Sequence, residues 1–191
     1  MYDTNKIVEE HIIAVKGFFE QHNQKILDLV DLIEFRLKNG GKIIAFGNGG
    51  SASDSSHFVA ELLGRYLEER NPIPAIDLTS SNSTVTAIAN DYGFSEIFAR
   101  QILGLADKND VILGISTSGK SENVLKGLAA APKTSLKVLL TSSKIEPFDI
   151  QLEISHNIDF IFKVPSDKTY VIQEIHIMFL HMLAGKIESL L

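Results

Sequence analysis

Cysteine is absent from the 191-residue sequence, so the protein has no disulfide, no thiolate metal ligand and no cysteine nucleophile. No run of about 18 apolar residues occurs, so no membrane-spanning helix is expected. An excess of positive charge is also lacking, because 24 acidic residues outnumber 18 lysines and arginines and the net charge is -6. That balance recruits neither nucleic acid nor an anionic membrane surface. A phosphate site would therefore have to be built locally, from loop amides and hydroxyls.

The sequence also lacks internal repeats, low-complexity tracts and linkers. Its hydrophobic content of 45% and charged content of 22% are ordinary for a globular protein, and 191 residues suffice for a substantial core. We therefore expect a single domain over 1–191. The N-terminus is polar and leads into no long apolar stretch, so no signal peptide is evident and the cytoplasm is the expected location.

Short apolar segments alternate with segments of helical periodicity after residue 41. The strand candidates are 42–46, 74–78, 110–115, 136–141 and 159–164, and the helix candidates are 52–69, 83–89, 94–105, 121–131 and 168–190. Strands that are apolar throughout are typical of buried parallel strands. The alternation predicts an α/β fold, a parallel sheet covered by helices on both faces. Segment 142–157 has no clear period and is predicted to be a loop with at most one short turn.

Both ends of the chain are predicted to be helical. Residues 4–38 carry apolar side chains at helical spacing and are predicted to form two amphipathic helices broken near His22 and Asn23, a hairpin over 1–38. The last helix candidate, 168–190, is apolar on nearly every side. Since one domain rarely buries a terminal helix all round, subunit association is the simplest explanation, with the N-terminal helices contributing.

Four hydroxyl side chains lie within six residues directly after the strand candidate 110–115. They belong to Ser116, Thr117, Ser118 and Ser121. Together with the N–H groups at the start of the next helix, such hydroxyls can hold a phosphate dianion without an arginine. The alternative is an ordinary Ser/Thr-rich turn with Ser121 as N-cap. The spacing of a Walker-type loop is absent, which disfavours a nucleoside triphosphate.

A second permissive loop, from Gly47 to Ser51, follows the strand candidate 42–46. Its Asn48, Gly49 and Gly50 would let the backbone pass close to sugar hydroxyls or to a nucleotide. The loop lacks the glycine spacing of a dinucleotide fingerprint. A plain strand-to-helix turn is the alternative.

Polar side chains on two helix candidates can carry chemistry. His57 and Glu61 are four residues apart and share a helix face, which suits a shared metal or a base held by its neighbour. A solvated helix face is the alternative. Gln173 and His181 are eight residues apart on roughly one side of the last helix, whereas His176 points elsewhere. A core or interface hydrogen bond is the alternative for these two, because buried polar groups need partners.

Two further segments hold candidate ligand-binding residues. Asn90 and Asp91 stand at a break between two helical patterns, where the aspartate either caps a helix or reaches a ligand hydroxyl. Arg65 either meets a phosphate or carboxylate, or is a surface arginine.

Five segments together carry a family resemblance. They are Gly-Asn-Gly-Gly-Ser at 47–51, the stretch from His to Arg-Tyr at 57–66, Ala-Asn-Asp-Tyr-Gly-Phe at 89–94, Gly-Ile-Ser-Thr-Ser-Gly-Lys-Ser at 114–121, and Ile-Gln-Glu-Ile-His at 172–176 with His181. In this order they closely resemble the phosphoheptose isomerase family of the sugar isomerase (SIS) domain superfamily, over nearly the whole chain. The Ser-Thr-Ser-Gly stretch marks only the superfamily, whereas His57 and Glu61 with Gln173 and His181 are far more specific.

The resemblance implies a three-layer α-β-α sandwich of the flavodoxin-like SIS type with a five-stranded parallel sheet. It implies a homotetramer with active sites at subunit interfaces, and one Zn²⁺ per subunit held by His57, Glu61, Gln173 and His181. The remaining positions that match or adjoin the family's substrate-binding residues are Asn48, Gly49, Gly50, Ser51, Arg65, Asn90, Asp91, Ser116, Thr117, Ser118 and Ser121. Glu61 and Gln173 are expected to contact the substrate as well.

The implied reaction converts sedoheptulose 7-phosphate to D-glycero-D-manno-heptose 7-phosphate through an enediol, the first step of bacterial heptose precursor biosynthesis. Glu61 and His181 are the expected acid and base, in an order left open. The alternative is a non-catalytic SIS regulator of the replication-initiator-associated type, a class that lacks this glutamate and histidine.

The chain departs from the family's pattern in two places. Segment 141–146 reads Thr-Ser-Ser-Lys-Ile-Glu where a Thr-Gly turn with a Gly-Gly pair is usual. Tyr170 and Val171 stand where a small or acidic residue and an arginine are common. These changes concern substrate selectivity and part of the subunit interface, and leave the four proposed metal ligands untouched.

Overall fold

The computed structural model describes residues 3–143 and 157–190. Its strands are β1 (Ile43–Gly47), β2 (Ala75–Asp77), β3 (Val111–Ile115), β4 (Leu136–Ser142) and β5 (Phe160–Val164). Its helices are α1 (Thr4–Lys38), α2 (Gly50–Leu63), α3 (Asn82–Tyr92), the 3-10 turn η1 (Phe94–Glu96), α4 (Ala99–Leu105), α5 (Glu122–Ala130) and α7 (Thr169–Glu188). The loop predicted at 142–157 falls mostly outside the described residues.

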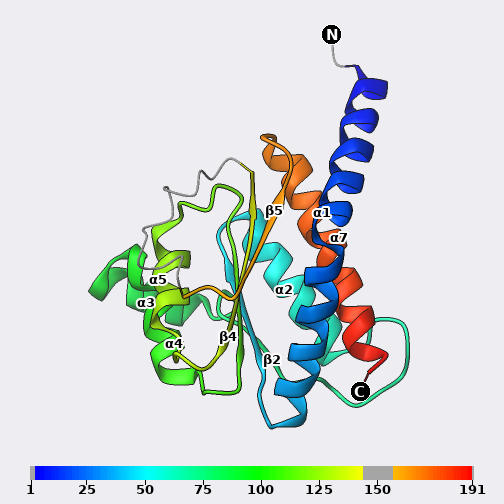
Figure 1. Cartoon of the computed structure of the whole chain (residues 1–191). Helices are drawn as coiled ribbons and strands as arrows, with labels where there is room; N and C mark the ends of the chain where they lie inside the picture. Colours follow the sequence, from blue (N-terminus) through cyan, green and yellow to red (C-terminus); the bar gives the residue numbers. More distant parts are fainter. Residues whose placement is uncertain (1–2, 144–156, 191) are drawn as a thin grey trace.

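The five strands form one parallel sheet in the order β2-β1-β3-β4-β5 (Figure 1). This confirms the predicted α/β fold, and each strand lies within a residue or two of its expected place. The strand order reverses beside β1, so the connections after β1 and β3 leave toward opposite faces. Loops that diverge in this way open a crevice at the carboxyl edge of the sheet, where ligands of such folds bind.

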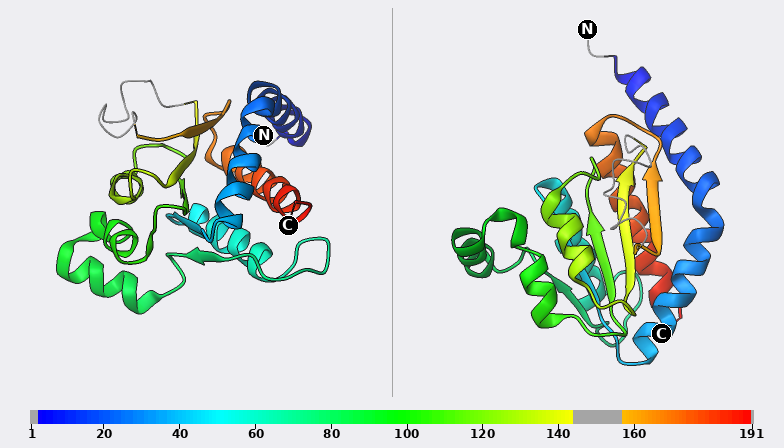
Figure 2. Two further views of the ribbon diagram at one scale, coloured as in Figure 1. Left: turned by 60° about the horizontal axis from the view of Figure 1, so that its bottom comes forward. Right: turned by 60° about the vertical axis from the view of Figure 1, so that its left-hand side comes forward.

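Helices cover both faces of the sheet and create two cores (Figure 2). Ile43 and Ala45 of β1 join the core under α1, α2 and α7, while Ile44 and Phe46 point into the core under α4 and α5. This alternation is what a strand buried on both sides requires. None of the described helices is both long enough and apolar enough to cross a membrane.

The predicted hairpin over 1–38 is wrong, because residues 4–38 form one continuous helix of 35 residues. Of the two polar residues that suggested a break, Asn23 is exposed on the helix surface and His22 is accommodated by tertiary contacts. His22 is 2% exposed, packs edge-on against Phe18 and Phe162, and accepts a hydrogen bond from the Lys163 N–H at 3.1 Å. The N-terminal turns of α1 extend beyond the rest of the described chain (Figure 1).

Three other helix predictions differ from the structure. The helix expected over 94–105 is split into η1 and α4, and the one expected over 52–69 ends at Leu63. The last helix is buried over most of its surface, but its 170, 174, 178, 182 and 186 positions form an exposed stripe. Met178 and Met182 are 41% and 37% exposed, so the helix is not buried all round within one chain.

Burial of His176 makes the stability of the fold sensitive to acid. The ring is fully buried against β4, where Nε2 donates to the Thr141 carbonyl at 3.0 Å, and desolvation lowers its pKa to about 4. Because the unfolded chain has a His pKa of about 6.5, acid protonates the unfolded state first. This contribution to stability is complete above about pH 6.5 and is lost as the pH falls toward about 4.

We predict that the free energy of unfolding falls by about 2 kcal/mol between pH 7 and pH 5 on account of His176 alone. Denaturant unfolding of the protein and of His176→Gln at both pH values measures the difference. The decrease in the free energy of unfolding from pH 7 to pH 5 should be smaller in His176→Gln. It should persist in the control His11→Gln, whose ring is only partly buried. An unchanged pH dependence of the free energy of unfolding in His176→Gln would contradict the prediction.

Candidate active site

Two loops meet at the carboxyl edge of the sheet, one after β1 and one after β3. Gly47, the last residue of β1, is paired with Ile115, the last residue of β3, so the loops begin side by side. Both lead directly into a helix, α2 after Gly49 and α5 after Ser121. The two loops therefore bring backbone amides and small polar side chains to this edge of the sheet.

The first loop depends on two glycines. Gly49 has a φ of 55° and forms the N-cap of α2 without any side-chain hydrogen bond. A Cβ on Gly50 would fall 2.2 Å from Nε2 of Gln173, so the amide of Gln173 lies directly on the backbone at the start of α2. The structure thereby brings Gln173 of α7 to the same loop as Asn48 and Ser51.

An amide pair ties the two loops together. Asn48 Nδ2 donates to Asn123 Oδ1 at 2.8 Å, and Asn123 Nδ2 donates back to Asn48 Oδ1 at 2.9 Å. Asn123 is 3% exposed and lies in the first turn of α5. Sequence reasoning gave no role to Asn123, and only its place directly after the serine-rich loop could have indicated one.

The second loop is folded by its own hydroxyls. Ser116 Oγ donates to Ser121 Oγ at 3.0 Å and accepts from the Gly119 N–H at 3.1 Å. Ser121 stands at the N-cap of α5, as the simpler interpretation expected, but its side chain makes no hydrogen bond to the helix amides. The Ser142 hydroxyl at the end of β4 donates to the Thr117 carbonyl at 2.8 Å, which fixes the loop to the neighbouring strand.

Three ligand atoms converge where α2 and α7 pack against each other. His57 Nε2 lies 3.0 Å from Glu61 Oε1, and His181 Nε2 lies 3.2 Å from His57 Nε2. One ligand atom from each of these three residues lies within 4.8 Å of the other two. We call these residues the His-Glu-His cluster. The helical spacing of His57 and Glu61 predicted their contact, and α7 adds a ligand from 124 positions away.

The cluster has the donor chemistry and spacing of a metal site. Two imidazole nitrogens and a carboxylate oxygen are ligands typical of catalytic Zn²⁺, which keeps a fourth position for water or substrate. Bonds of about 2.0 to 2.1 Å in a tetrahedron place neighbouring ligand atoms about 3.3 Å apart, close to the 3.0 and 3.2 Å that separate His57 Nε2 from its two neighbours. The donor atoms of the His-Glu-His cluster are therefore near enough to one another to share a metal ion.

Gln173 lies about two turns before His181 on α7. The two residues are eight apart, a rise of about 12 Å, and the amide of Gln173 lies against Gly50 at the start of α2. The structure thus brings together three of the four expected metal ligands in one chain. Gln173 as the fourth ligand stays a prediction.

Asp54 is a site neighbour that sequence reasoning missed. It lies one turn before His57 on α2, and its Oδ2 is buried without a hydrogen-bond partner among the described residues. Burial raises the pKa of this carboxyl to about 6, against the opposing effect of the His57 charge. Residue spacing alone could have found it, since it shares the helix face of Gly50, His57 and Glu61.

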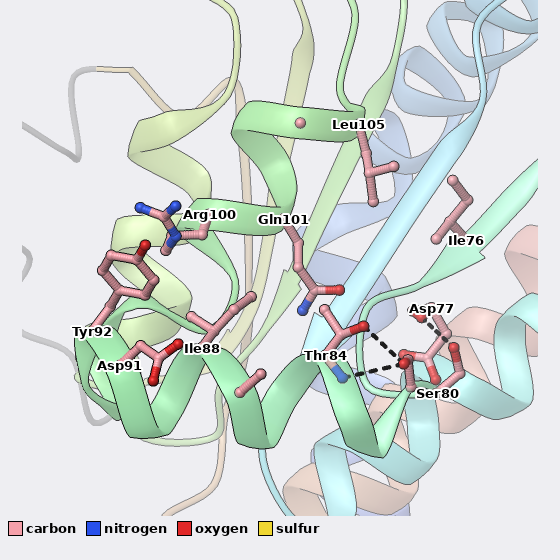
Figure 3. Close-up of a pocket in the computed structure, with 13 residues that line it drawn as sticks. Ile76, Asp77, Ser80, Thr84, Ile88, Asp91, Tyr92, Arg100, Gln101 and Leu105 are labelled. Carbon is pink, nitrogen blue, oxygen red and sulfur yellow. Dashed lines mark hydrogen bonds between the residues drawn. The ribbon is translucent and has the colours of Figure 1, made fainter.

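Asn90 and Asp91 lie apart from the cluster, at the end of α3. Asp91 is inside the helix and does not cap one, because the helical patterns are separated by Gly93 with a φ of 93°. It lines a cavity of about 630 Å³ between α3 and α4, together with Tyr92 and Arg100 (Figure 3). The Arg100 guanidinium lies over the Tyr92 ring, 3.6 Å from its centroid.

Arg65 is exposed in the segment after α2. Its Nε lies 4.0 Å from Glu69 Oε2, and both side chains are more than half exposed. Within one chain it therefore has the geometry of a surface arginine, and substrate contact by Arg65 stays a prediction.

Comparison with known proteins places this architecture in a family. The SIS domain family model matches residues 9–143. Phosphoheptose isomerases from Thermodesulfovibrio yellowstonii and Helicobacter pylori strain P12 are 42% and 44% identical, over 97% and 93% of this chain and 90% of each relative. The structure of a phosphoheptose isomerase from Neisseria gonorrhoeae superposes with a TM-score of 0.85 at 35% identity, covering 97% of this chain and 96% of that one. That of a Francisella tularensis phosphoheptose isomerase gives 0.85 at 34% identity, covering 99% and 100%. The chain therefore belongs to the SIS domain family and, within it, to the phosphoheptose isomerases.

Proposed function

We propose that this protein is a zinc-dependent aldose–ketose isomerase that converts sedoheptulose 7-phosphate to D-glycero-D-manno-heptose 7-phosphate. Family membership supports the coarser statement, that the protein is an enzyme acting on a sugar phosphate. The observation that carries the finer one is the His-Glu-His cluster, because two of its three residues lie on α2, the helix that begins at the first loop.

The reaction needs two proton transfers. A carbon-bound proton leaves C1 of the ketose and returns to C2, and a proton moves from the C1 hydroxyl to the C2 oxygen, through an enediol. Glu61 and His181 are the pair that would move these protons. Glu61 faces His57 through Oε1, and its second oxygen makes no hydrogen bond within the described part of the chain, which suits a base.

The metal ion and the chain's own residues would divide the work. Zn²⁺, when bound by His57, Glu61 and His181 with Gln173 as the proposed fourth ligand, supplies electrophilic stabilisation of the oxygens at C1 and C2. Asn48, Gly49, Gly50 and Ser51 would orient the sugar.

The serine-rich loop is the proposed anchor for the phosphate. Ser116, Thr117, Ser118 and Ser121 surround the start of α5, where the partial positive charge of a helix N-terminus favours an anion. Binding energy at the phosphate would orient the distant C1 and C2 for reaction.

Association into a homotetramer, with active sites at subunit interfaces, is part of the proposal. Apolar side chains on α1 support it, since Val8, Ile13 and Phe35 are 56%, 71% and 60% exposed in the single chain. Large exposed apolar groups on one long helix are typical of surfaces that a partner covers. Substrate contacts by Arg65, Asn90 and Asp91, a cytoplasmic location and a role in heptose precursor biosynthesis belong to the same proposal.

The metal proposal predicts a thermal shift. Zn²⁺ at about 100 times its Kd should stabilise the fold by about 2.7 kcal/mol, which raises Tm by about 5 to 10 °C for a domain of this size. His57→Ala should lose most of the shift. His11→Ala is the matched control, because His11 pairs with Glu174 outside the cluster and its loss should leave the shift intact. An equal shift in His57→Ala and the parent would contradict the proposed ligand set.

The isomerase proposal predicts a labelled product. In deuterated water with Zn²⁺, NMR should show the aldose forming from sedoheptulose 7-phosphate with deuterium at C2. Glu61→Gln should lower turnover by about 100-fold or more while still binding the sugar phosphate, since proton transfer by a placed side chain contributes about that much. Glu174→Gln is the matched control for loss of a carboxylate. Formation of no aldose and no deuterium incorporation would refute the proposal.

If the serine-rich loop anchors the phosphate, removing one of its hydroxyls should lower the affinity for phosphate. Thr117→Val keeps the shape of the side chain but removes its hydroxyl, and a hydrogen bond to a charged group is worth about 1.5 to 3 kcal/mol. We expect kcat/KM to fall by about 10-fold or more, and competitive inhibition by inorganic phosphate to weaken in parallel. Thr134→Val, at the opposite edge of the sheet, is the control. Unchanged inhibition in Thr117→Val would exclude this anchor.

A further inference from the structure

The segment that follows α2 is fixed by the end of α7. Glu188 accepts hydrogen bonds from the backbone N–H groups of Tyr66, Leu67 and Glu68 at 3.2, 2.9 and 3.1 Å. Burial alone would raise the pKa of Glu188, but these amides and the Arg70 charge lower it, so the carboxylate stays ionised near neutral pH. The segment is therefore held to α7 by a charged acceptor rather than by loose packing.

Arg70 fixes the other side of the same segment. Its Nε lies 3.3 Å from Glu188 Oε1, and its terminal nitrogens donate to the carbonyls of Leu62 at 2.8 Å and Glu61 at 2.7 Å. These carbonyls belong to the last turn of α2. No following turn of the helix supplies N–H groups to them, so they need donors from elsewhere. The pair Glu188 and Arg70 thus joins the ends of α2 and α7 immediately beyond the His-Glu-His cluster.

The fixed segment lays the Tyr66 ring flat against the imidazole of His181. The two ring centroids are 5.6 Å apart and the planes are inclined by only 16°. On the next turn of α7, a Cβ added to Gly185 would come within 3.2 Å of Tyr66 Cε1, so the ring rests on the bare backbone of a glycine. His57 meets His181 from another side, with centroids 4.8 Å apart and planes at 73°.

We propose that Tyr66 is a positioning residue that holds the His181 imidazole in the orientation that turns Nε2 toward His57 and Glu61. Rotation of that imidazole about its Cβ–Cγ bond would break the parallel contact with Tyr66. Packing that fixes the orientation of a metal-binding histidine raises metal affinity, because less ordering remains to be done on binding. The inference rests on the metal centre proposed above, although the ring orientation itself does not.

The test measures Zn²⁺ affinity by competition with a chromophoric chelator, in the absence of substrate. Tyr66→Phe keeps the ring and should bind Zn²⁺ within about twofold of the parent. Tyr66→Ala removes the ring and should bind about 10-fold more weakly, the lower end of the effect of outer ligand partners. Gly185→Ala should also weaken binding by displacing the ring, although alanine is a better helix former than glycine.

A double-mutant comparison separates positioning from general damage. If Gly185→Ala acts through the ring, it should cost no further affinity in the Tyr66→Ala background. Zn²⁺ affinity of Tyr66→Ala equal to that of the parent, or an undiminished effect of Gly185→Ala in the double variant, would overturn the proposal. An equal loss in Tyr66→Phe would also overturn it, because the ring would then not be the cause.

NMR of the metal-free protein tests the positioning independently of the proposed enzyme. The His181 ring protons should be shifted upfield by the facing Tyr66 ring in the parent and in Tyr66→Phe, and should lose that shift in Tyr66→Ala. If Tyr66→Ala loses the upfield shift but the parent protein does not bind Zn²⁺, the proposed metal centre is rejected and the role of Tyr66 in orienting His181 stands. Identical His181 shifts in all three proteins would reject the role of Tyr66.

Discussion

The parallel packing of α2 against α7 is the contact on which the proposed site depends. One face of α2 presents Gly50 and His57, seven residues apart, and the facing side of α7 presents Gln173 and His181, eight residues apart. Because both helices advance about 1.5 Å per residue, these intervals span about 10.5 and 12 Å, so the two faces stay nearly in register over about two turns. The pairing places a glutamine at the first loop and a histidine at the cluster, and the glycine at position 185 admits Tyr66 beyond it.

The sheet supplies the other half of the site. Reversal of the strand order beside β1 sends the two loops toward opposite faces of the sheet, and the reciprocal amide pair of Asn48 and Asn123 holds them together. The first loop leads into the helix that bears His57 and Glu61, while the second offers hydroxyls at a helix start. The elements that carry the proposed substrate-binding residues therefore meet at the carboxyl edge of the sheet.

The architecture could be predicted from the sequence because it rests on local signals. Apolar strands alternating with amphipathic helices indicate a parallel sheet. The four-residue spacing of His57 and Glu61 on a helix indicates their contact. The approach of His181 could not be derived from periodicity, because it depends on the register of two helices distant in sequence; only the family resemblance supplied it. The break expected at His22 fails for a similar reason, since β5 provides the partner that a polar residue in a helix needs. Asn123 lies in no pattern that is distinctive by itself, whereas the position of Asp54 on the same helix face as His57 and Glu61 is a signal that the sequence does contain.

Two histidines and a glutamate, brought together by this helix pair, are proposed to bind the ion on which the chemistry depends. Anomalous X-ray scattering at the zinc absorption edge, from crystals of the full chain grown with Zn²⁺, tests this binding most directly. The account predicts a peak within bonding distance of His57, Glu61 and His181. A zinc peak bonded elsewhere, with this cluster empty, would contradict it.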